Sequence, residues 1–129
     1  MQGKGFLVVG GLLAGSAVAL GALGAHALKD KLSVEQMVSF ETAVHYQMYH
    51  AIALILVGIV ANRSVSRLLR ATGWMFALGI VLFSGGIYGW LFTSIKPLVH
   101  VVPVGGIIWI VAWICFAVSQ FSSSTQREI

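Results

Sequence analysis

The chain is poor in charged residues and in cysteine, and both shortages narrow the class of protein that it can be. Asp, Glu, Lys and Arg together make up 9% of its 129 residues, against about 25% in soluble domains. This composition excludes an ordinary soluble globular domain, a disordered chain and a coiled coil. The single cysteine, Cys115, excludes an internal disulfide framework, a CxxC redox pair and a cysteine-based zinc site.

Signs of nucleic-acid binding and of catalysis are also missing. The net charge is +4, and the eight Lys and Arg residues stand in five separate places, which leaves no basic face for a phosphate backbone. The sequence has no HExxH, GxSxG or P-loop pattern, and no carboxylate lies within its apolar stretches. We therefore expect no nucleic-acid partner, no enzyme activity and no cofactor.

What the sequence does have is long uncharged stretches, and they predict a membrane protein. Four intervals contain no charged residue: 5–28, 42–62, 71–95 and 97–126. Each is long enough for one span, since about 20 apolar helical residues cross the hydrocarbon core of a bilayer. The spans must be helices because lipid offers free backbone groups no hydrogen-bonding partner. We predict an all-α integral membrane four-helix bundle with up-down topology.

Residues 1–129 are expected to form a single membrane domain in contact with the lipid bilayer. The helices are placed at about 5–28, 43–62, 71–95 and 103–121, with a polar tail at 122–129. Pro103 suits the first turn of the last helix, where its missing N–H is not needed. Ser64 or Ser66 could cap the third helix.

The first span also resembles a cleavable signal peptide. Lys4, the apolar run after it and Ala25-His26-Ala27 imitate such a peptide and its cleavage site. The run is longer than the apolar core of about 7–15 residues that signal peptides have. We therefore expect a retained helix.

The connection between the first two spans has room for structure of its own. Ser33 followed by Gln36 is a capping-box pattern, and an apolar stripe follows it. We predict a short amphipathic interfacial helix at about 33–41, which lies on the membrane surface and runs into the second span. A solvated loop is the alternative.

Lys and Arg are divided unequally between the two sides of a four-span chain, and this predicts the orientation. The side with both termini and the 63–70 connection carries five of them, and the other side carries three. By the positive-inside rule, we expect both the N- and C-termini to be cytoplasmic in a cell membrane, either inner or plasma membrane.

Glycine is concentrated in the first and third spans. Gly11 and Gly15, and likewise Gly85 and Gly89, have the small-xxx-small spacing that allows two helices to approach closely. We expect these positions to pack inside the bundle, so that Gly15→Leu or Gly85→Leu would destabilise it. Gly3, at the N-terminus, is expected to be exposed.

The functional lead is the set of polar residues within the spans. An up-down path brings His26, His45, His50 and His100 into the non-cytoplasmic half, and Glu41 could pair with His45 one turn away. We expect His50 to be a neutral strut, bonded to Tyr88, Ser84 or a backbone carbonyl. His45 and His50 are five residues apart, about 140° round a helix, and cannot easily chelate one metal together. We expect no bound haem or metal.

Four sequence blocks resemble those of a small membrane family. Residues 21–28 (GALGAHAL) and 40–50 (FETAVHYQMYH) look like signature blocks of the domain of unknown function 423 family, which includes YgdD and transmembrane protein 256. Residues 83–88 (FSGGIY) and 103–106 (PVGG) resemble its third and fourth blocks. The resemblance implies a four-helix inner or plasma membrane protein and implies no activity.

The resemblance also separates primary from secondary candidates within the polar cluster. The members that match the family pattern are His26, Tyr46, Gln47, His50, Ser84 and Tyr88. His45 stands where the family often has Arg and is a secondary candidate, as are Glu41 and His100.

Two functions remain open. The first is a structural or interaction role, with a possible homo-oligomer or membrane-protein partner and a polar cluster that locks the fold. The second is a protein that binds or transports a small solute, a proton or a lipid through the same cluster. A closed network of polar residues would favour the first, and a cavity open to lipid or to the outer face would favour the second.

Overall fold

The computed structural model of the chain describes residues 3–64 and 66–124. Its long helices are α1 (Gly3–Leu23), α2 (Val34–Ala61), α3 (Arg67–Thr93) and α4 (Val102–Ser124). A π-helical turn, η1 (Gly24–Leu28), continues α1, and a 3-10 helix, η2 (Lys96–Val101), leads into α4. The four helical segments are each long and apolar enough to cross a membrane, so the predicted all-α four-helix bundle is confirmed.

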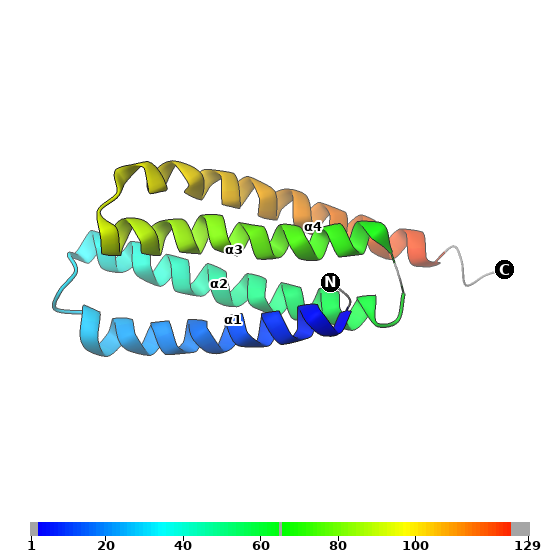
Figure 1. Ribbon diagram of the computed structural model, residues 1–129, viewed down its shortest axis with the longest axis horizontal. Coiled ribbons are helices and arrows are strands. Elements are labelled where there is room, and N and C mark those ends of the chain that lie inside the picture. Colours follow the sequence, from blue (N-terminus) through cyan, green and yellow to red (C-terminus); the bar gives the residue numbers. More distant parts are fainter. Residues whose placement is uncertain (1–2, 65, 125–129) are drawn as a thin grey trace.

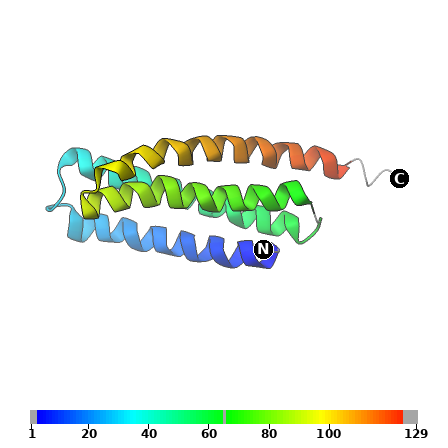
Figure 2. The same cartoon turned by 45° about the horizontal axis from the view of Figure 1, so that its top comes forward.

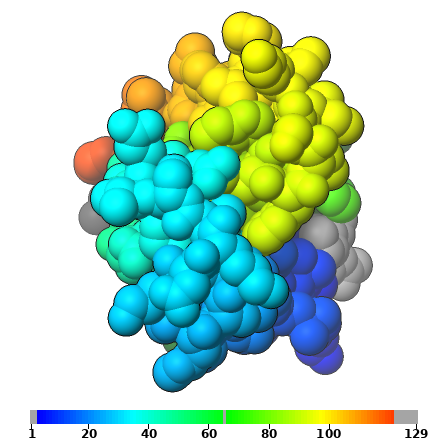
Figure 3. Space-filling model, turned by 90° about the vertical axis from the view of Figure 1, so that its left-hand side faces the viewer, coloured from blue at the N-terminus to red at the C-terminus, as the bar shows by residue number. Residues whose placement is uncertain are grey.

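The helices run up and down in chain order (Figures 1 and 2). Helix α2 packs against both α1 and α3, and α4 packs against α3. The start of α1, the α2–α3 connection and the far end of α4 lie at one end of the bundle (Figures 1 and 2). Figure 3 looks at the opposite end, where the start of α2 in cyan lies beside the yellow segment around η2.

Helix α2 begins at a capping box, as the sequence predicts. Ser33 Oγ accepts a hydrogen bond from the Gln36 N–H at 3.1 Å, and the Ser33 N–H donates to Gln36 Oε1 at 3.0 Å. From there α2 runs without interruption from Val34 to Ala61. The expected interfacial helix at 33–41 is therefore no separate element but the first turns of α2, because nothing between 41 and 43 breaks the helical hydrogen bonding.

The other helix ends also follow local chemistry. Ser66 Oγ accepts a hydrogen bond from the Leu69 N–H and caps α3, which makes Ser66 and not Ser64 the capping residue. Helix α3 ends at Ser94, whose left-handed backbone (φ 59°) turns the chain. Helix α4 continues to Ser124, beyond the expected 121, and residues 125–129 of the expected tail lie outside the described residues.

Close packing uses only one of the four glycines expected to pack: a Cβ on Gly89 would lie 2.8 Å from Leu98 Cδ1 of η2. A Cβ on Gly11 or Gly15 would meet nothing within 4 Å, and one on Gly85 would meet only the Ile80 carbonyl oxygen at 3.8 Å. By contrast, a Cβ on the buried Gly3 would lie 2.6 Å from the Gly58 carbonyl oxygen. The expectations for Gly15, Gly85 and Gly3 were wrong because spacing along one helix does not reveal which face its neighbour covers.

Other glycines allow a neighbouring helix or a large side chain to pack closely against their own helix. A Cβ on Gly10 would lie 2.9 Å from the Ala51 carbonyl oxygen, so Gly10 sets the approach of α1 to α2. A Cβ on Gly79 would lie 2.1 Å from Trp109 Nε1, so Gly79 makes room on α3 for an indole of α4. Large apolar side chains such as Leu12, 70% exposed, cover the outside, which suits a surface that faces lipid.

Candidate functional site

The polar residues expected to form one cluster are divided between two sites. One is a closed hydrogen-bond network where α1, α2 and α3 meet. The other is an open aromatic groove between α2 and α4, backed by α3. The division follows from helix geometry, because His50, three residues after Gln47, lies about 60° round α2 from it.

Gln47 is the centre of the closed network. Its side chain is 4% exposed. Its Nε2 donates to the Leu13 carbonyl oxygen at 3.0 Å and to Ser16 Oγ at 2.8 Å, both on α1. Its Oε1 accepts from the Tyr88 hydroxyl of α3 at 2.9 Å. One amide therefore links three helices and uses both its donors and its acceptor within the protein.

Ser84 adds a second link between α2 and α3. Its hydroxyl is fully buried and donates to the Ala43 carbonyl oxygen at 2.7 Å. Ser84 and Tyr88 are thus both bonded to residues other than His50. Of the three partners expected for His50, neither Tyr88 nor Ser84 bonds it, because its ring nitrogens face the Tyr46 carbonyl oxygen of α2 and Trp113 of α4.

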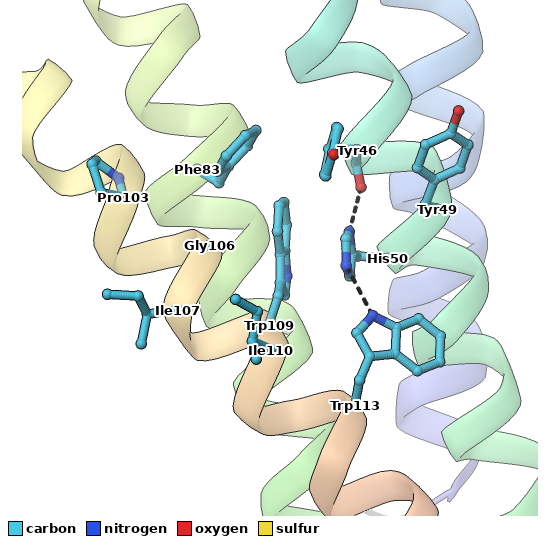
Figure 4. A pocket seen from close by; sticks show the side chains of 10 residues that line it. All are labelled: Tyr46, Tyr49, His50, Phe83, Pro103, Gly106, Ile107, Trp109, Ile110 and Trp113. Carbon is cyan, nitrogen blue, oxygen red and sulfur yellow. Dashed lines mark hydrogen bonds between the residues drawn. The ribbon is translucent and has the colours of Figure 1, made fainter.

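His50 is buried, 5% exposed, and both of its ring nitrogens have partners. Nδ1 lies 2.8 Å from the Tyr46 carbonyl oxygen, and Nε2 lies 3.2 Å from Nε1 of Trp113 (Figure 4). A carbonyl can only accept and an indole N–H can only donate. His50 is therefore a neutral imidazole with its proton on Nδ1, and the expected bond to a backbone carbonyl is confirmed.

Trp109 supports the His50 ring from α4. Their ring centroids are 3.6 Å apart and the planes differ by 2°. Trp109 is itself buried, fits against Gly79 and donates from Nε1 to the Phe76 carbonyl oxygen at 3.2 Å. The indole is held from two sides, so it presents a fixed surface to the imidazole.

Sequence reasoning missed both tryptophans. Trp109 and Trp113 are four residues apart, which places them on one face of α4. Pro103 and Gly106 lie on the same side of the helix and also line the groove. This spacing was the available signal, but aromatic residues in an apolar span look like lipid-facing or packing residues until the opposite helix is known.

The groove between α2 and α4 has a volume of about 640 Å³. Figure 4 shows the side chains that line it, of which His50 and Trp109 are buried at its base. The lining residues are Tyr46, Tyr49, His50, Phe83, Pro103, Gly106, Ile107, Trp109, Ile110 and Trp113. Its rim is exposed on the lipid-facing surface, with Ile107 61% exposed and Trp113 41% exposed.

The remaining candidates lie outside both sites. His26, His45, His100 and Glu41 are exposed. Glu41 and His45 line a separate pocket of about 260 Å³ beside η1. Among residues 3–64 and 66–124, no three His, Cys, Asp or Glu side chains lie close enough to hold a metal ion. The expectation of no bound metal or haem stays a prediction.

His50 also lies deeper than the other histidines. It is about 24 Å along the axis from Val34, near the middle of a helix about 42 Å long. Trp113 is similarly central in α4. The groove therefore extends from the end of the bundle near η2, where Pro103 lies, to about mid-span.

Comparisons with known proteins agree with the resemblance seen in the sequence. Residues 20–106 match the family described as "Protein of unknown function (DUF423)". The UPF0382 membrane protein SH2409 of Staphylococcus haemolyticus is 39% identical over 118 residues, 92% of this chain and 96% of the relative. The UPF0382 membrane protein YwdK of Bacillus subtilis is 38% identical over 117 residues, 90% of this chain and 95% of the relative.

No solved structure matches the chain. The family match covers more than half of the sequence, from the end of α1 to the first turn of α4. The chain therefore belongs to the DUF423 family, a group of multi-pass membrane proteins for which no activity is established.

Proposed function

We propose that the protein binds a small, mostly apolar molecule taken from the bilayer, in the groove between α2 and α4. The observation that carries this proposal is the position of His50. A buried imidazole lies at the base of an aromatic groove whose rim is exposed on the lipid-facing surface. Polar side chains within a membrane are costly, and they commonly mark functional sites.

The size and the lining of the groove support this function. Ligand pockets usually have volumes of about 300–1,000 Å³ and are mainly apolar, with a few polar groups that orient the ligand. The groove falls within this range at about 640 Å³, and five of its ten lining residues are Phe, Tyr or Trp. Its few polar groups are the His50 imidazole, the indole N–H of Trp113 and the hydroxyls of Tyr46 and Tyr49.

The structural role has its own support elsewhere in the bundle. Gln47 and Ser84 hold α1, α2 and α3 together in a closed network. The fold thus has a dedicated set of polar links, and His50 is placed instead against the partly exposed Trp113. The closed network supports a rigid scaffold, and the open groove supports ligand binding upon it.

The proposed binding involves no chemical conversion. The side chains that line the groove include no carboxylate, cysteine, serine or lysine. His50 has its proton committed to the Tyr46 carbonyl oxygen. General-base catalysis would need, besides an imidazole nitrogen, a partner group to complete the reaction, and no carboxylate, cysteine, serine or lysine lines the groove to provide one.

We place the protein in the inner or plasma membrane with cytoplasmic termini. The distribution of Lys and Arg supports this orientation. The groove then lies in the non-cytoplasmic half of the bilayer and reaches the midplane.

The proposal is tested by what copurifies with the protein. Organic extracts of protein purified in mild detergent are analysed by mass spectrometry for wild type, Gly106→Leu and Gly15→Leu. The Gly106→Leu side chain fills the groove, whereas a side chain at Gly15 meets open space on α1. We expect one apolar compound, near one per chain, in wild type and Gly15→Leu but strongly reduced in Gly106→Leu. Equal amounts in all three, or none in any, would overturn the proposal.

A further inference from the structure

We propose that the groove is selective for a ligand with a hydroxyl group, an apolar alcohol or phenol, which inserts between His50 Nε2 and Trp113 Nε1. This inference rests on the proposed function and specifies the chemical class of the ligand. It follows from the hydrogen-bonding capacity of these two side chains.

The His50 ring offers a fixed acceptor. Its Nδ1 proton is held by the Tyr46 carbonyl oxygen at 2.8 Å, and its face is stacked on Trp109 at 3.6 Å. Turning the ring would break both contacts. Nε2 therefore keeps its lone pair directed toward Trp113.

The Trp113 side chain is the movable partner. Its N–H reaches Nε2 at 3.2 Å, the long end of the usual range for such bonds. The residue is 41% exposed at the rim of the groove, whereas His50 is 5% exposed. An outward shift of the indole by about 2 Å makes room for one oxygen atom between the two nitrogens.

Only some chemical groups satisfy both nitrogens after this shift. A hydroxyl has one donor and two acceptor lone pairs, so it can donate to Nε2 and accept from the Trp113 N–H. A ketone, ether or ester oxygen can accept from Trp113 but leaves Nε2 without a donor. A site built around a polar group discriminates strongly against an analogue that leaves this group unpaired.

The rest of the groove sets the nature of the ligand body. Phe83, Pro103 and Ile107 line the groove toward the η2 end, and they provide apolar and aromatic contact. No charged side chain lines the groove, so a charged headgroup has no partner there. An uncharged ligand with one hydroxyl and a chain or ring of carbon atoms fits this environment.

The test uses two probes that differ in the hydroxyl alone. 4-Octylphenol and its methyl ether, 4-octylanisole, are titrated into protein in lipid nanodiscs, and the Trp113 indole ¹H–¹⁵N resonance is followed, assigned with Trp113→Phe. We expect a saturable shift and binding of the phenol about tenfold tighter than that of the ether. His50→Phe, which keeps a ring against Trp109 but has no acceptor, should remove the difference. His45→Phe, the same change at an exposed position, should preserve it.

Each outcome bears on a different claim. Equal affinity for the phenol and the ether overturns the selectivity but leaves binding in the groove intact. Absence of binding by both probes overturns the selectivity together with the proposed function. A phenol preference that persists in His50→Phe assigns the hydroxyl to another residue and overturns the inference. If His50→Phe does not fold, the ¹⁵N shift of His50 Nε2 in wild type decides, and a protonated Nε2 in the phenol complex contradicts the inference.

Discussion

The imidazole of His50 and the indole of Trp109 lie face to face, with centroids 3.6 Å apart and planes within 2° of parallel. The two residues come from helices α2 and α4, which meet mainly through such side chains. The stack gives His50 a fixed orientation at the base of the groove, and Gly79 and the Phe76 carbonyl oxygen hold Trp109 in turn.

Removing the His50 side chain should destabilise the fold. His50→Ala leaves the Trp113 N–H unpaired and removes the ring from Trp109, so we expect a loss of about 1–3 kcal/mol in the free energy of unfolding. His50→Gln retains an acceptor for Trp113 and should recover part of the loss. The free energies of unfolding are compared by SDS titration in mild detergent. If His50→Ala is as stable as wild type, His50 makes no structural contribution.

The Tyr88 hydroxyl should contribute to stability and the Tyr49 hydroxyl should not. Tyr88→Phe removes the bond to Gln47, for which we expect about 1 kcal/mol, in the range measured for side-chain hydrogen bonds between membrane helices. Tyr49, 55% exposed at the groove rim, provides the matched control. Equal unfolding free energies for the two variants would show that the Gln47 network does not hold the helices together.

Gly79→Ala should be destabilising although it adds a single methyl group. Its Cβ would lie 2.1 Å from Trp109 Nε1 and 2.3 Å from Trp109 Cδ1, and overpacking of this kind costs about 1–3 kcal/mol. Gly15→Ala, with nothing within 4 Å of its Cβ, should leave stability unchanged or raise it slightly. Thermal unfolding in detergent tests the pair, and similar midpoints would refute the tight fit of Trp109 against α3.

The orientation should appear in the reactivity of single cysteines in a Cys115→Ser background. Asp30→Cys lies in the connection between η1 and α2, and Ser64→Cys lies in the connection between α2 and α3. In intact cells, an impermeant thiol reagent should label Asp30→Cys but not Ser64→Cys until the membrane is opened. Labelling in the reverse order would invert the orientation.

The architecture was predictable because lipid imposes a simple rule on the sequence. Long uncharged intervals must be helices, and the capping residues Ser33 and Ser66 mark where two of them begin. For residues 33–42, the sequence predicted a capped helix but not that this helix is continuous with the second span. A helix that enters the membrane and one that lies on its surface can have the same cap and a similar apolar stripe.

The arrangement of the site was less predictable because it depends on which faces meet. The depth of His50, Tyr88 and Ser84 can be counted from the sequence, and this counting suggested that they were partners. Depth does not give rotation about the helix axis, and the structure turns His50 toward α4. Similarly, the glycine spacing in α1 and α3 did not reveal that Gly15 and Gly85 face outward.

The central claim, that the α2–α4 groove binds an apolar molecule from the bilayer, is tested most directly by photolabelling. A fatty alcohol with a diazirine in its chain is irradiated with the protein in nanodiscs, with and without excess unlabelled alcohol, and labelled residues are mapped by mass spectrometry. We predict saturable labelling within segments 46–50 and 103–113, which contain most of the residues that line the groove. Labelling spread evenly over exposed apolar residues such as Val8, Leu12 and Val81, without competition by the unlabelled alcohol, would contradict the claim.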